Sequence, residues 1–153
     1  MKYLLYLFPI FLVGCGSKSS TGSLKDHVKD KQHEIESAVD RFEQSGYKKI
    51  SFGPPDFLTF VNSDGSSREI TVNMRVVDGE PSNNDALELE AVSYVRLFRD
   101  ADIRCVEKGI GLYVDFPNGG RLLICKGDAK KASQLLHGEK SVEVYPGWYT
   151  FIE

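Results

Sequence analysis

The chain has 153 residues and a formal net charge of -3, and 41% of its residues are hydrophobic. This length is enough for one domain with a proper core and leaves little room for two. The weak negative charge argues against a nucleic-acid partner, and a protein of this charge would also gain little from an anionic membrane surface.

The first 14 residues have the order of a bacterial secretion signal. Lys2 lies beside the amino terminus, an apolar run follows over residues 3–13, and Gly14 leads to Cys15. A membrane-spanning helix needs about 20 predominantly apolar residues, so this run is too short for one. We therefore expect residues 1–14 to be a signal that is cleaved from the mature protein.

The residues at the expected cleavage site, Leu12-Val13-Gly14-Cys15, resemble the lipobox of bacterial lipoproteins. The resemblance covers the signal only, and it implies that Cys15 becomes the acylated amino terminus, with palmitate-type chains on its thiol and amine. Two or more acyl chains hold a protein stably in a bilayer. An aspartate after the lipidated cysteine commonly retains a lipoprotein in the inner membrane, whereas here that residue is Gly16. We therefore expect a lipid-anchored envelope protein, facing the periplasm from the outer membrane rather than the inner one.

The mature chain divides into a short linker and one domain. Removal of the 14-residue signal from the 153-residue chain leaves 139 residues, of which 18 are basic and 22 are acidic. Residues 16–22 are almost entirely Gly, Ser, Thr and Lys, a composition that behaves as a flexible linker. We predict a lipid-anchored tether over residues 15–23 and a single domain over residues 24–153.

The first half of this domain has the pattern of one helix followed by three strands. Ser23 and Asp26 resemble a capping box, and apolar residues at helical spacing predict a helix over residues 24–44 that ends at Ser45-Gly46. Strands are predicted at residues 50–52, 57–61 and 70–77, and the last two are joined by a turn at residues 62–66.

The second half opens with a helix whose end can be placed in two ways. Its apolar positions begin at residue 87 and step by four and three. The helix either stops near Asp100, followed by a strand over residues 103–107, or continues to Lys108-Gly109. Two strands at residues 110–116 and 121–125, a helix over residues 128–137, and strands at residues 142–144 and 148–152 complete the chain. The predicted fold is α+β, with one mostly antiparallel sheet of about six or seven short strands and three helices.

Two cysteines, Cys105 and Cys125, remain if Cys15 is acylated, and an exported protein meets an oxidising compartment. If the second helix runs to Lys108, its end can pack beside Cys125 and the two cysteines can form a disulfide. If instead they flank the middle strand of a meander, they lie about 9.5 Å apart, beyond the reach of about 7 Å between bridged Cα atoms. We predict the disulfide, with two buried free thiols as the alternative.

No catalytic, cofactor or metal motif is recognisable, and we predict no such site. His27 and His33 are six residues apart and fall on different faces of a helix, whereas a zinc pair would use a spacing such as i, i+4. His137 suits the end of a helix, where a partly protonated imidazole interacts well with the dipole. We interpret the acidic residues that could form a catalytic pair as solvated surface groups: Glu88, Glu90, Asp100 and Asp102.

Aromatic residues gather near the carboxyl terminus and include the single tryptophan. Tyr145, Trp148 and Tyr149 form a candidate binding patch, because Tyr and Trp are favoured at recognition surfaces. The alternative is a core strand with every second aromatic side chain pointing inward. We expect a non-enzymatic lipoprotein that binds a protein or another envelope component, in its most specific form as an inhibitor or immunity-type protein. The alternative is an envelope hydrolase with a carboxylate-based site.

Overall fold

The computed structural model describes residues 20–53, 57–72, 86–125, 134, 136 and 140–151. The predicted signal and Cys15, the predicted lipidation residue, lie outside this range. So do most of the predicted tether, residues 73–77 of the third predicted strand, and almost all of the helix predicted over residues 128–137.

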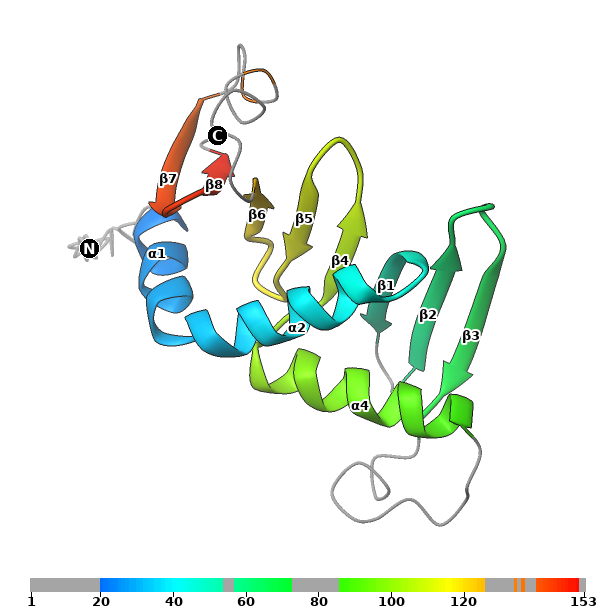
Figure 1. The fold of residues 1–153 in the computed structure, drawn as a ribbon. Helices are drawn as coiled ribbons and strands as arrows, with labels where there is room; N and C mark the ends of the chain where they lie inside the picture. Colours follow the sequence, from blue (N-terminus) through cyan, green and yellow to red (C-terminus); the bar gives the residue numbers. More distant parts are fainter. Residues whose placement is uncertain are drawn as a thin grey trace, which may run out of the picture.

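One antiparallel sheet of eight strands forms the described part of the domain, with three helices packed against it (Figure 1). The order of the strands in the sheet is β3-β2-β1-β4-β5-β6-β8-β7. The predicted α+β class and the antiparallel sheet are confirmed, although the sheet has slightly more strands than predicted. The strands are β1 (Tyr47–Gly53), β2 (Phe57–Asn62), β3 (Ser67–Thr71), β4 (Cys105–Lys108), β5 (Leu112–Asp115), β6 (Arg121–Ile124), β7 (Ser141–Tyr145) and β8 (Trp148–Phe151).

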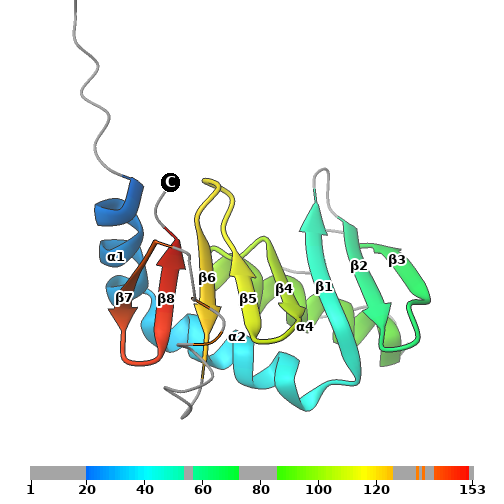
Figure 2. The same cartoon turned by 90° about the horizontal axis from the view of Figure 1, so that it is seen from above.

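The single helix predicted over residues 24–44 is instead two helices. They are α1 (Ser20–Asp30) and α2 (Gln32–Gln44), and between them Lys31 has φ -114° and ψ 15°. Figure 2 shows α1 following the direction of β7 and β8 and α2 turning to cross the sheet. The helix also begins four residues earlier than predicted, so Ser23 lies inside α1 and the predicted capping box is wrong.

All three helices lie on the same face of the sheet, where the hydrophobic core forms. Buried residues of α1, α2 and α4 (Ala86–Asp100) belong to one cluster with alternate residues of the strands. The aromatic rings of Phe60, Tyr94 and Phe98 pack edge to face, with centroids 5.8 Å and 6.1 Å apart. No helix in the described part of the chain is both long and apolar enough to cross a membrane.

The predicted disulfide between Cys105 and Cys125 is wrong. Helix α4 ends at Asp100, so Cys105 begins β4 and Cys125 directly follows β6, with β5 between them. In the register of the sheet, Cys105 lies opposite Asp115, and Asp115 lies opposite Arg121. Cys125 lies four residues beyond Arg121 along the chain. Standard strand spacings place the two cysteines about 16 Å apart, far beyond disulfide reach. Both thiols are buried, and neither forms a disulfide.

Candidate interaction surface

The face of the sheet opposite the helices, here called the outer face, carries side chains in two rows. Residues directly opposite on neighbouring antiparallel strands have Cβ atoms about 5 Å apart, so each row is a line of contacts. The first row is Lys49, Glu107, Tyr113, Leu123, Tyr149 and Glu143. The second row is Ser51, Cys105, Asp115 and Arg121.

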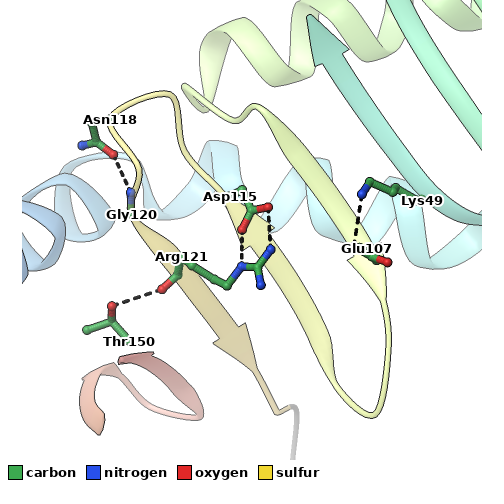
Figure 3. A network of polar contacts seen from close by, with 7 residues as sticks. All are labelled: Lys49, Glu107, Asp115, Asn118, Gly120, Arg121 and Thr150. Carbon is green, nitrogen blue, oxygen red and sulfur yellow. Dashed lines mark hydrogen bonds and ion pairs between the residues drawn. The ribbon is translucent and has the colours of Figure 1, made fainter. Parts of the chain in front are cut away.

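Two ion pairs make a charged strip across β1, β4, β5 and β6. Lys49 Nζ lies 3.4 Å from Glu107 Oε2. Arg121 donates from Nε and Nη2 to the two carboxylate oxygens of Asp115, at 2.5 Å and 2.9 Å (Figure 3). The Arg121 guanidinium also lies 5.5 Å from the ring centroid of Tyr113. Each acid therefore has its own base, and the strip as a whole is neutral.

Cys105 lies among these four charged residues but is itself buried. Burial raises the pKa of its thiol from 9.0 to about 11, because the thiolate would lose its hydration. The thiolate is the nucleophilic form of cysteine, so this shift suppresses reactivity near neutral pH. The environment of Cys105 is that of an inert structural thiol.

An apolar corner lies beside the strip, where β5, β6 and β8 meet. Leu123 and Cys125 are buried there on the outer face, separate from the main core. Tyr113, Tyr149 and Phe151 are partly buried against them, as is Leu136 from the segment between β6 and β7. The Tyr149 hydroxyl is hydrogen bonded to Glu143, and burial together with this carboxylate raises the pKa of the phenol.

The predicted patch of Tyr145, Trp148 and Tyr149 does not form one surface. Trp148 is 4% exposed and belongs to the main core, on the helix side of the sheet. Tyr145 packs against Trp148 with ring centroids 5.4 Å apart. Tyr149 points to the outer face, because successive residues of a strand alternate between the two faces. The prediction is therefore wrong for Trp148, and Tyr149 joins Tyr113 instead.

The histidines and acidic residues that the sequence offers as site candidates lie apart from one another. His27 packs edge-on against Phe116, with ring centroids 5.0 Å apart, whereas His33 is exposed on α2. Glu90 accepts a hydrogen bond from the Tyr47 hydroxyl at 3.1 Å. Within the described ranges no three His, Cys, Asp or Glu residues are grouped as a metal site would require. His137 lies outside these ranges. The two pockets described among the placed residues are lined by none of Glu88, Glu90, Asp100 and Asp102.

A groove of about 370 Å³ lies at one end of the sheet, beside the β4–β5 turn. Its lining includes Glu43, Lys108, Ile110 and Cys125. Ile110 stands between two glycines at the tip of this turn and is 70% exposed. Lys108 donates to the backbone oxygen of Ser45 at 3.0 Å, which ties the turn to the end of α2. The groove has a mixed polar and apolar lining, without a group of three His, Cys, Asp or Glu side chains among the described residues.

Comparison of the chain with known protein families, curated proteins and solved structures finds no match. The chemistry of the surface is therefore the basis for a functional proposal.

The sequence patterns did not single out Tyr113, Asp115 and Arg121, which lie at the centre of the outer face. A signal for them was present. The two strands flanking the turn at residues 117–120 were predicted to pair, and alternation along residues 112–115 puts Tyr113 and Asp115 on one face. The missing information was which face the helices cover.

Proposed function

We propose that this chain is a lipid-anchored protein of the bacterial envelope that binds a protein partner through the outer face and catalyses no reaction. The observation that carries the proposal is the placement of Tyr113, Arg121 and Tyr149 where the charged strip meets the apolar corner. Tyr and Arg are among the residues most enriched at the energetic centres of protein interfaces. In the most specific form of the proposal, the partner is an envelope toxin or hydrolase that this domain inhibits.

The charges of the outer face favour a protein over a nucleic acid. Lys49 and Arg121 are balanced by Glu107 and Asp115, and Glu143 adds a further negative charge to the first row. Nucleic acid binding depends on unbalanced Lys and Arg that replace counterions on phosphates. A surface of paired charges beside aromatic rings instead offers orientation-dependent polar contacts to a partner with a similarly mixed surface.

The geometry of the reactive groups supports a role in binding. Asp115 and Glu107 are each engaged by a cation on a neighbouring strand, so they are held as structural ion pairs. The thiol of Cys105 is buried and has a raised pKa. In a hydrolase that uses two carboxylates, both groups would have to face the same substrate pocket, one as the acid and the other as the nucleophile or as the base that activates water.

Anchoring comes from the lipobox-like sequence ending at Cys15. The described domain begins with α1 at Ser20, so only residues 16–19 separate the helix from the expected lipid. Membrane attachment would place the outer face in the aqueous compartment next to the bilayer. The glycine that follows Cys15, in place of an aspartate, supports the outer membrane as the site of attachment.

Site-specific photo-crosslinking in the native host tests the proposed surface. The lipidated protein would carry p-benzoylphenylalanine in place of Tyr149, and a matched control would carry it in place of His33, which is exposed on α2. We expect a single reproducible adduct from position 149 and little or none from position 33. Equal adducts from both positions, or no adduct from position 149 in repeated experiments, would contradict the assignment of the outer face.

A further inference from the structure

The chain enters the domain at one end of the sheet, here called the entry end, made up of the start of α1 and the β5–β6 turn at residues 116–120. A Cβ atom on Gly120 would lie 3.1 Å from Leu24 Cδ1, so the turn touches the early part of α1. The rings of His27 and Phe116 pack together one turn further along the helix. Figure 2 shows the start of α1 and the β5–β6 turn at the same end of the sheet.

The opposite end, here called the far end, consists of the β4–β5 turn and the end of α2. Lys108 Nζ donates to the backbone oxygens of Glu43 and Ser45, which holds these two elements together. Ile110 is exposed at the tip of the turn. Strand β5 joins the two ends, and the path from Ile110 to Pro117 spans about 24 Å at about 3.4 Å per residue.

The expected tether is short compared with the domain. Four residues separate Cys15 from Ser20, the first residue of α1. Fully extended, this segment spans at most about 18 Å. Helix α1 has 11 residues, or a length of about 16 Å, and leads from the entry end toward the far end. Contact between the far end and the bilayer would hold the start of α1 about 24 Å from the lipid, farther than a tether of about 18 Å can reach, whereas contact at the entry end requires no stretching.

The chemistry of the entry end is compatible with a lipid surface. Pro117, Asn118 and Gly119 are exposed and uncharged, so the turn is not repelled by anionic headgroups. Asn118 Oδ1 accepts a hydrogen bond from the backbone N–H of Gly120 at 3.0 Å, which stabilises the compact turn (Figure 3). This turn can approach headgroups without burying an unpaired charge.

We propose that the entry end rests on the phospholipid headgroups that surround the acyl chains of Cys15, and that the far end points away from the bilayer. This orientation rests on the lipidation proposed above. It leaves Ile110 and the groove beside it facing the aqueous compartment. The strands of the sheet then run at a large angle to the membrane plane. Partners in the compartment can reach both surfaces without displacing lipid.

Fluorescence quenching in vesicles tests this orientation. The lipidated protein would be made as Pro117→Cys and as Ile110→Cys, two positions at opposite ends of β5, and labelled in its folded state with a small thiol-reactive fluorophore. The unsubstituted protein controls for labelling of the buried Cys105 and Cys125. The vesicles are phosphatidylcholine and phosphatidylethanolamine with a nitroxide on a fraction of the headgroups, which quenches only at close approach. Flotation of the same samples measures membrane attachment.

We expect the protein to float with the vesicles and the label at position 117 to be quenched at least threefold more than the label at position 110. Flotation with equal quenching, with stronger quenching at position 110, or with no quenching at either position would overturn the orientation while leaving lipid anchoring intact. Failure of the protein to float would overturn the anchoring, and the orientation with it.

Discussion

Single residues decide which aromatic side chains lie on the outer face of the sheet. Trp148 and Tyr149 are adjacent in sequence, yet Trp148 fills the core and Tyr149 lies on the outer face. The sequence shows that aromatic residues gather near the carboxyl terminus. Only the alternation of side chains along the strand shows which of them point to the core and which to the outer face. The same alternation puts Cys105 on the outer face. Its side chain is buried there, and this burial keeps the thiol unreactive.

The raised pKa of Cys105 predicts a loss of stability at alkaline pH. Because the folded-state pKa is about 11 and the ordinary value is 9.0, the neutral thiol favours the folded state fully below pH 9. This contribution is lost as the pH rises from 9 toward 11. We expect Cys105→Ala to lower the free energy of unfolding by about 1–2 kcal/mol near neutral pH, with a deficit that shrinks across this range.

Denaturant unfolding followed by circular dichroism at several pH values would measure this effect. Val106→Ala on the same strand is the matched control, because it removes buried methyl groups without removing a titratable group. Its deficit should not vary between about pH 8 and about pH 11, the range in which thiols titrate. A constant deficit for Cys105→Ala as well would show that the thiol is not protected from ionisation by the fold.

At the scale of single elements, turns were easier to predict than helix boundaries. The turns predicted at residues 62–66 and 117–120 contain Gly65 and Gly119, both with φ of 87°, a conformation that favours glycine. The helix start was predicted from a side-chain cap at Ser23, but α1 begins at Ser20. The break at Lys31 has no Pro or Gly to signal it, and it lies between Val28 and Ile35, which are both buried in the main core.

Alanine substitution of three glycines separates backbone strain from steric overlap. Gly46→Ala has open space around it and no positive φ, so we expect little change in stability. Gly65→Ala has space but φ of 87°, and should cost about 1–2 kcal/mol. Gly147 has φ of 79°, and an added Cβ would also lie 2.9 Å from the backbone oxygen of Cys125. Gly147→Ala should therefore be the most destabilising of the three in thermal unfolding, and a cost no greater than that of Gly65→Ala would contradict the close approach of the two backbones.

The end of α2 depends on a lysine from another element. Lys108 Nζ donates to the carbonyl oxygen of Ser45 and lies 4.9 Å from the ring centroid of Phe42. A cation near helix carbonyls and over an aromatic ring stabilises by about 1–2 kcal/mol in total, so Lys108→Met should lower the free energy of unfolding by that amount. Lys48→Met, at an exposed position of β1, should change it by less than about 0.5 kcal/mol. Equal effects in denaturant unfolding would show that Lys108 does not cap the helix.

For the whole molecule, the pairing of strands that are neighbours in the chain could be predicted from the sequence, and the pairing of distant strands could not. The hairpins β2–β3, β5–β6 and β7–β8 follow from turn residues between alternating segments. The pairings β1–β4 and β6–β8 join segments far apart in the chain, so no local pattern specifies them. These two pairings bring Lys49 beside Glu107 and Leu123 beside Tyr149, and hence assemble the outer face.

The proposed membrane attachment through Cys15 has a direct consequence at this scale. Replacing the thiol by a hydroxyl removes the group that accepts the diacylglyceryl unit, so Cys15→Ser should leave the protein without palmitate and with an unprocessed signal. We expect metabolic labelling with palmitate to mark the wild-type chain and not this variant. Palmitate incorporation and normal signal cleavage in Cys15→Ser would exclude the proposed lipidation.

The proposed binding function of the outer face is tested most directly by the affinity of the purified domain for the protein captured by crosslinking at position 149. Calorimetric titration would compare the wild type with Tyr149→Ala and with His33→Ala, after thermal unfolding has shown that both variants are folded. We predict a Kd at least tenfold higher for Tyr149→Ala, about 1.4 kcal/mol of binding free energy, and no change for His33→Ala. Equal affinities of Tyr149→Ala and the wild type would contradict the assignment of the outer face as the binding surface.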